Sequence, residues 1–178
     1  MDRRQFQLTL AAGLVTAFPA AATENAPTQP HLTHLCNITA RLLPPVDIGE
    51  GPQGRRRLIP ISGGEVTGER LRGTLLPGGA DFQRIRPDAV TEIQARYVIE
   101  THDGHKVYVE NTGLRRAPPE VMARLMKGEV VDPALVYFRS TPRFEAPDGP
   151  YTWLERSLFL CSGARFPEHV VLRLFEVT

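Results

Sequence analysis

Apolar and polar residues alternate along much of the chain, as expected of β-strands with one buried face. Two alternating segments, residues 90–101 and 105–112, are separated by Asp103-Gly104, a strong two-residue hairpin signal. The residues that share the apolar face are Ile93, Ala95, Tyr97 and Ile99 in the first arm, and Val107, Val109 and Asn111 in the second. We therefore predict an antiparallel hairpin that buries this face.

The same reading predicts further strands and the turns between them. The strands are expected at residues 35–43, 55–61, 71–76, 81–86, 136–145, 152–162 and 169–177. Turns are expected at Ser62-Gly63-Gly64 and Pro77-Gly78-Gly79, and a loop rich in Gly and Pro before Gly54.

Only residues 119–127 predict a helix, with Pro119 at its start and Gly128 just past its end. The chain has 16 Pro and 15 Gly among 178 residues, which favours short elements over a helical bundle. We predict an all-β fold, a single-domain antiparallel β-barrel of about 8–10 strands with one short helix. Closure of the barrel removes exposed sheet edges.

The first 22 residues have the three-part plan of an export signal. Arg3 and Arg4 precede an apolar stretch, which ends in Ala20-Ala21-Ala22, and the arginine pair resembles a twin-arginine signal. The stretch is shorter than the ~20 residues that span a bilayer, so no stable membrane anchor is expected after cleavage near Ala22. Residues 23–34 are expected to form a polar tether, residues 35–178 the barrel domain, and the mature protein to be periplasmic.

The charge balance bears on the class of partner. The formal net charge is +1, and removal of Asp2, Arg3 and Arg4 with the leader brings it to zero. No nucleic-acid partner is expected, because such domains are strongly basic. The run Arg55-Arg56-Arg57 is typical of a solvated strand edge.

Cofactor and metal motifs are missing from the sequence. His102 and His105 flank the hairpin turn, but a catalytic zinc usually takes three protein ligands. No glycine-rich nucleotide loop or serine-hydrolase elbow is found, so neither metal nor cofactor is expected. Cys36 and Cys161 are compatible with a disulfide or with two buried free thiols, and both alternatives stay open.

The segment 137–145 carries polar residues on one face: Tyr137, Arg139, Thr141, Arg143 and Glu145. Such a face either meets solvent or lines a wet interior pocket, where ionisable groups are costly unless paired or used. The pattern alone favours solvent.

Five blocks occur together in this order: 57–64 (RLIPISGG), 73–82 (GTLLPGGADF), 108–113 (YVENTG), 137–145 (YFRSTPRFE) and 151–154 (YTWL). Together they resemble the bacterial and fungal domain-of-unknown-function family 3237, over about residues 35–178. The resemblance implies an antiparallel β-barrel with a central cavity and says little about activity. The family's recurrent polar and aromatic residues would fall on Asp81, Asn111, Arg139, Glu145 and Trp153.

The sequence departs from the family pattern at three positions. Phe82 stands where Trp is expected, Glu155 where Asn is expected, and Cys161 where a small residue, usually Gly, is expected. An acid in place of an amide at Glu155 would alter ligand preference if that position lines the cavity.

Three hypotheses for function remain open. The first is a cofactor-independent lyase, isomerase or hydrolase acting on a small aromatic or apolar-anionic compound in the cavity. Its catalytic residues would be Asp81, as general acid or base, and Arg139, which would orient the substrate. Its ligand-binding residues would be Tyr97, Asn111, Glu145, Trp153 and Glu155. The second is a periplasmic, lipocalin-like binding protein, and the third a structural network of Asp81, Arg139 and Glu145 in a filled barrel.

Overall fold

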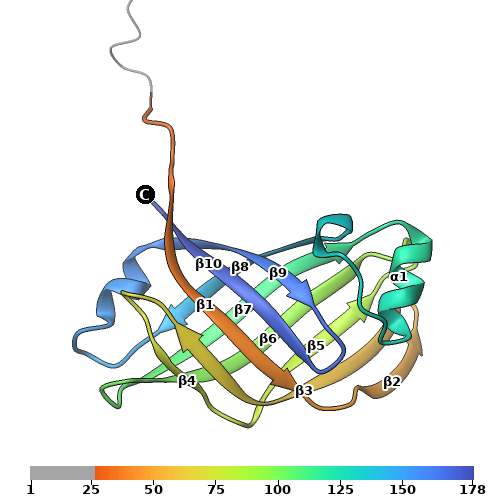
Figure 1. Cartoon of the computed structure of the whole chain (residues 1–178), viewed down its shortest axis with the longest axis horizontal. Coiled ribbons are helices and arrows are strands. Elements are labelled where there is room, and N and C mark those ends of the chain that lie inside the picture. Colours follow the sequence, from red (N-terminus) through yellow and green to blue (C-terminus); the bar gives the residue numbers. More distant parts are fainter. Residues whose placement is uncertain (1–26) are drawn as a thin grey trace, which may run out of the picture.

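Ten strands and one α-helix make up residues 27–178, the part of the chain that the computed structural model describes (Figure 1). The strands are β1 (Leu32–Leu42), β2 (Val46–Gly51), β3 (Gly54–Thr67), β4 (Gly73–Leu75), β5 (Gly79–Ile85), β6 (Thr91–Thr101), β7 (Lys106–Arg116), β8 (Tyr137–Glu145), β9 (Leu158–Arg165) and β10 (His169–Val177). The helices are α1 (Pro119–Met126) and two 3₁₀ turns, η1 (Pro133–Leu135) and η2 (Thr152–Arg156). The predicted all-β fold with one short helix is confirmed.

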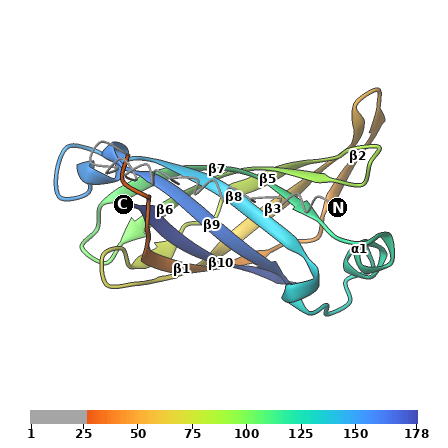
Figure 2. The same cartoon turned by 90° about the horizontal axis from the view of Figure 1, so that it is seen from above.

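The sheet closes on itself because β1 pairs with two strands. It is antiparallel to β10 on one side and to β3 on the other. From β10 the order runs through β9, β8, β7 and β6, and β5 then joins β6 to β3. The result is an elongated barrel whose first and last strands lie side by side (Figures 1 and 2). β2 extends the sheet from β3 beyond this ring, and the short β4, like β5, pairs with both β3 and β6.

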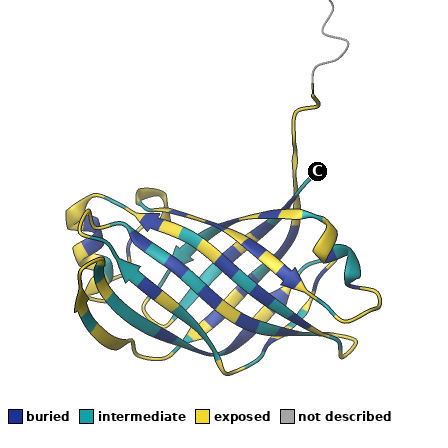
Figure 3. Cartoon of the chain, turned by 180° about the vertical axis from the view of Figure 1, so that it is seen from behind, coloured by how far each residue is buried: buried dark blue, intermediate teal, exposed yellow. Residues whose placement is uncertain are grey.

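Side chains alternate between the barrel interior and its outer surface, as the striped burial of the ribbons in Figure 3 makes plain. In β6 the buried positions are Thr91, Ile93, Ala95, Tyr97, Ile99 and Thr101, which includes all four predicted apolar positions. Val107, Val109 and Asn111 of β7 are also buried. The core therefore lies inside the barrel, and the hairpin's inner face was predicted correctly.

α1 lies at one end of the barrel (Figures 1 and 2). Val121 and Met122 bury its apolar side, and Met126 Sδ lies 3.2 Å from Nη1 of Arg57 in β3. The helix thus contacts the barrel end at which Arg57 lies.

The turn predicted at Ser62-Gly63-Gly64 is wrong, because β3 continues through it to Thr67. The register with β1 shifts between Arg41 and Leu42, which leaves a β-bulge at this place. Gly63 adopts a φ of +127°, and a bulge is a common place for glycine in a strand. The glycine signal therefore marks a bend in a strand and not its end.

Two other segments differ from expectation. β2 forms in the predicted loop. Its residues are largely exposed on both faces, so the sequence has no alternation of apolar and polar residues there that would predict a strand. Residues 152–156 form η2 instead of the start of a strand, because Thr152 Oγ1 and the backbone of Gly149 hydrogen-bond each other and hold a turn. β1 begins at Leu32, three residues before the expected strand, and the backbone of His31 hydrogen-bonds to that of Thr178.

Cys36 and Cys161 are buried free thiols. Both are in register with Leu174 of β10, one from β1 and one from β9. Two strand spacings therefore separate them, about 9–10 Å, whereas a disulfide needs Cα atoms within about 7 Å. Of the two alternatives, the structure favours the free thiols.

The leader expected at residues 1–22 lies outside the described residues and stays a prediction. Across residues 27–178 we find no helix with the length and apolar character needed to cross a membrane.

Candidate functional site

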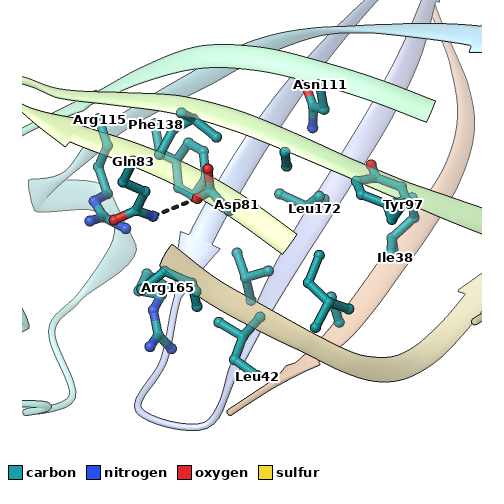
Figure 4. A pocket seen from close by; sticks show the side chains of 16 residues that line it. Ile38, Leu42, Asp81, Gln83, Tyr97, Asn111, Arg115, Phe138, Arg165 and Leu172 are labelled. Carbon is teal, nitrogen blue, oxygen red and sulfur yellow. Dashed lines mark hydrogen bonds between the residues drawn. The ribbon is translucent and has the colours of Figure 1, made fainter. Parts of the chain in front are cut away.

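A cavity lies inside the barrel, bounded by strands on every side (Figure 4). The cavity is narrow, with a volume of about 40 Å³. The lining residues are Ile38, Ala40, Leu42, Ile59, Ile61, Asp81, Gln83, Ile93, Ala95, Tyr97, Asn111, Arg115, Phe138, Arg165, Val170 and Leu172. A mostly apolar wall with a few polar groups is typical of small-molecule sites.

Asp81 projects into the cavity from β5 and holds two hydrogen bonds. Its Oδ1 accepts from the backbone N–H of Gln94 at 2.9 Å, and its Oδ2 from Nε2 of Gln83 at 2.5 Å. Burial raises the pKa of the Asp81 carboxyl, against the opposing effect of these bonds and of Arg115 and Arg57. A carboxyl whose pKa is raised toward the working pH is suited to move protons.

Asp81 is linked through Gln83 to Arg57. Nε of Arg57 donates to Oε1 of Gln83 at 2.8 Å, so one amide bridges the guanidinium and the carboxyl. The register explains the arrangement, because Asp81 pairs with Ile59, and Gln83 pairs with Arg57 two residues further along both strands.

Arg115 enters the cavity from β7 and is 3% exposed. Its guanidinium lies 5.9 Å from the ring centre of Phe138, and its buried Nε has no hydrogen-bond partner among the described residues. Burial and the nearby Arg57 lower its pKa to about 10. A buried guanidinium without a paired anion is costly.

Tyr97 and Asn111 supply the other polar groups of the cavity. The hydroxyl of Tyr97 and Oδ1 of Asn111 are both buried and make no close hydrogen bond within residues 27–178, although the Asn111 side chain lies near enough to the Tyr97 hydroxyl to oppose the rise of its pKa. Burial raises the pKa of Tyr97, so its phenol stays protonated and can donate. A donor and an acceptor without a close partner among the described residues thus lie on the same wall, near each other.

The structure brings together three of the seven predicted site residues: Asp81, Tyr97 and Asn111 (Figure 4). Asp81 and Asn111 both pair with Ala95, so Asp81, Ala95 and Asn111 form one row across β5, β6 and β7. Tyr97 is two residues from Ala95 on the same face of β6.

The other four predicted residues do not reach the cavity. In β8 the inward positions are Phe138, Ser140, Pro142 and Phe144, which turns Arg139 and Glu145 to the outside. Arg139 lies 5.5 Å from the ring centre of Tyr137 and borders an outer groove. Arg139 therefore does not meet Asp81 in the cavity as expected. The polar face of this strand is its solvent-exposed face.

Trp153 and Glu155 lie on η2 because that segment is not a strand. Arg70 covers the Trp153 ring at 4.1 Å, and Glu155 accepts a hydrogen bond from the backbone N–H of Ala146 at 2.7 Å. Both contacts fix the η2 segment outside the cavity.

Gln83, Arg115 and Arg165 were not predicted as site residues, and Arg57 was expected to face solvent. Arg115 continues the inward series of Val107, Val109 and Asn111, but the strand was expected to end at residue 112. Continuing the alternation from Asn111 through residue 113 would have placed Arg115 on the inner face. Nothing in the run of three arginines shows that Arg57 faces inward.

No group of three or more His, Cys, Asp or Glu side chains able to hold a metal ion occurs within residues 27–178. The cavity's polar groups are one carboxyl, two amides, one phenol and the arginines. They suit hydrogen bonding, anion binding and proton transfer.

Comparison with known proteins places these features in context. A family model described as a protein of unknown function (DUF3237) matches residues 30–177. A UPF0311 protein of Rhodopseudomonas palustris strain TIE-1 is 49% identical over 144 residues, or 81% of this chain and 94% of that protein. A UPF0311 protein of Clostridium acetobutylicum is 41% identical over 143 residues, or 80% of this chain and 90% of that one.

Solved structures share the fold. The crystal structure of a conserved protein of unknown function from R. palustris has a TM-score of 0.82 at 46% identity, covering 86% of this chain and 100% of that one. A protein from Penicillium herquei, described as an enzyme, has a TM-score of 0.65 at 18% identity, covering 86% and 98%. The second likeness extends to the fold alone.

Proposed function

The chain belongs to the family of unknown function DUF3237, and we propose that it binds a small, largely apolar compound in its barrel cavity and transforms it by cofactor-independent acid–base chemistry. One observation carries the proposal. Three buried polar atoms of the cavity lining, on Tyr97, Asn111 and Arg115, make no close hydrogen bond with the described residues. Each such atom costs about 1–3 kcal/mol, which a ligand with matching polar groups would recover.

Asp81 is the proposed general acid or base. It is the one carboxylate in the cavity lining, and its raised pKa brings proton exchange closer to neutral pH. The Tyr97 hydroxyl would donate to a substrate oxygen, and Asn111 Oδ1 would accept from a substrate hydroxyl. Proton transfer alone can drive lyase, isomerase or hydrolase steps.

A second candidate function is binding without chemistry, as in lipocalins. Both oxygens of Asp81 already accept hydrogen bonds, from Gln94 and Gln83, and this observation favours it. In that case Asp81 would shape the cavity, and a bound compound would leave unchanged. We place either activity in the periplasm, on the leader expected at residues 1–22, and N-terminal sequencing of the exported protein tests that placement.

The experiment combines bound-ligand detection with turnover. The protein is purified without denaturant, and native mass spectrometry identifies bound small molecules, which are then incubated with wild type, Asp81→Asn and Asp148→Asn. Asp148 is exposed and serves as the matched control. We expect wild type and Asp148→Asn to convert a compound that Asp81→Asn binds but leaves unchanged. Binding by all three without conversion selects the second candidate, and full conversion by Asp81→Asn removes Asp81 from the mechanism.

A further inference from the structure

Three arginines from three strands gather at one end of the cavity. Arg57 comes from β3, Arg115 from β7 and Arg165 from β9, and the last two line the cavity directly (Figure 4). Asp81 is the one carboxylate among the lining residues. Even with Asp81 ionised, this end of the cavity carries two positive charges in excess.

The arginines contact neutral groups only. Arg57 donates to the Gln83 amide at 2.8 Å and to Met126 Sδ at 3.2 Å, and Nη1 of Arg165 donates to the carbonyl of His169 at 3.1 Å. Within residues 27–178, none of the ion pairs involves any of the three arginines. Other arginines of the barrel, such as Arg84 and Arg96, pair with a glutamate on a neighbouring strand.

The three guanidinium groups also repel one another. Arg57 lowers the pKa of both Arg115 and Arg165, in addition to the larger effect of burial, and Asp81 offsets part of it. Uncompensated like charges in a protein interior destabilise the fold. Retaining three of them beside a cavity is explained if an anion occupies the space between them.

We propose that this arginine cluster is the subsite for the carboxylate of an arylalkanoic acid, a small acid whose aromatic body extends into the apolar part of the cavity. The inference rests on the proposed function and names its substrate class. A carboxylate fits the planar fork of Arg115, whose buried Nε makes no hydrogen bond with the described residues. The ring of Phe138, beside Arg115, belongs to the apolar part of the cavity wall, against which the substrate's ring would pack.

The register sets the length of this ligand. Arg115 pairs with Thr91, and Asn111 pairs with Ala95, so the two side chains start four residues apart on the same face of β7. That separation is about 13 Å along the strand, part of which the arginine side chain spans. A ring joined to its carboxylate by two or three carbons would bridge the Arg115 end and the row of Asp81 and Asn111.

The test uses matched probes. Calorimetry compares 3-phenylpropanoate with its neutral isostere 3-phenylpropanamide, on wild type, Arg115→Met and Arg139→Met. Arg139 faces outward and is the control. We expect wild type and Arg139→Met to bind the acid at least tenfold more tightly than the amide, and Arg115→Met to lose that preference. We also expect Arg115→Met without ligand to melt at a higher temperature, because it removes an unpaired buried charge.

Each other outcome overturns the inference in a distinguishable way. Equal binding of acid and amide to wild type removes the anion subsite and leaves the proposed cavity function standing. If phenyl phosphate binds more tightly than the acid, the arginine cluster is a subsite for a phosphate group and not for a carboxylate. If wild type binds neither aromatic probe, the arylalkanoate assignment is wrong. The native mass spectra then test the proposed function independently, because they detect any bound compound. Arg165→Met provides the same comparison if Arg115→Met fails to fold.

Discussion

Asp81 binds neutral donors on both carboxylate oxygens although arginines lie nearby. Its direct partners are an amide side chain and a backbone N–H, and Arg57 reaches it only through Gln83. The charges of the cavity are therefore held close together without being neutralised in contact. At the scale of single residues, Asp81 and Tyr97 are therefore each expected to change the free energy of unfolding measurably when replaced.

The pH dependence of stability should report Asp81. Its pKa is higher in the folded protein than the usual 3.8, so the folded state holds the proton more tightly. Stability from this group is full below about pH 4 and falls as pH rises toward the folded pKa, by up to about 1.4 kcal/mol per pH unit. Asp81→Asn should lack this fall. Urea unfolding of both proteins from pH 4 to 8 gives the difference, and parallel curves would contradict the raised pKa.

Tyr97→Phe should separate stability from binding. The change removes a buried hydroxyl without a partner in the described residues, so we expect the ligand-free protein to gain up to about 1 kcal/mol in unfolding free energy. Affinity for a ligand with a matching oxygen should fall. Urea unfolding and calorimetry measure the two effects. Tyr108→Phe is the control, since its hydroxyl donates to Glu110 at 3.1 Å. A clear loss of stability in Tyr97→Phe would mean that the hydroxyl is satisfied.

At the scale of elements, the inner faces of β6 and β7 followed from their alternation, and so did the helix with Pro119 at its start and Gly128 after its end. These signals are local. The outward direction of Arg139 was also contained in the alternation of β8, which favoured solvent, whereas the family resemblance favoured the cavity.

The features that were not predicted are of two kinds: local elements without an alternating pattern, and one cluster that joins distant strands. β2 exists because it pairs with β3, and η2 because of a local turn that its polar alternation does not reveal. The arginine cluster joins Arg57, Arg115 and Arg165, and no pattern within one strand relates residues that far apart. The part of the candidate site formed by Asp81, Tyr97 and Asn111 could therefore be predicted, and the arginine cluster could not.

The bulge in β3 should be sensitive to any side chain at Gly64. A Cβ at this position would lie 2.2 Å from the carbonyl oxygen of Thr39 in β1, and backbone atoms cannot give way cheaply. We expect Gly64→Ala to cost at least about 1–3 kcal/mol in unfolding free energy. Gly51→Ala, whose new Cβ would meet only a backbone oxygen at 3.7 Å, is the control. Thermal unfolding compares the two, and equal melting temperatures would contradict the close approach.

At the scale of the whole molecule, the barrel is held by strand pairing and its apolar interior, without a disulfide between Cys36 and Cys161. Both thiols belong to the core cluster, on either side of Leu174. Burial raises the pKa of Cys36 to about 12 and that of Cys161 to about 11. The reactive thiolate is therefore scarce in the folded state.

Thiol reactivity should accordingly follow global unfolding. We expect neither thiol to react with Ellman's reagent in the native protein near pH 8, and both to react in concentrated urea. The melting temperature should be unchanged by dithiothreitol. A melting temperature that falls on reduction would instead reveal a disulfide and contradict the separation across β10.

The pairing of β1 with β10 has a consequence for the order of synthesis. Thr33 and Thr178, whose hydroxyl oxygens lie 3.3 Å apart, are separated by 145 residues of chain. Such contacts give the fold a high contact order and slow its folding. On the ribosome, β9 presents an open sheet edge until β10 emerges, and such edges invite aggregation. The nascent chain thus stays an unfinished sheet until the nine residues of β10, His169–Val177, emerge and close it.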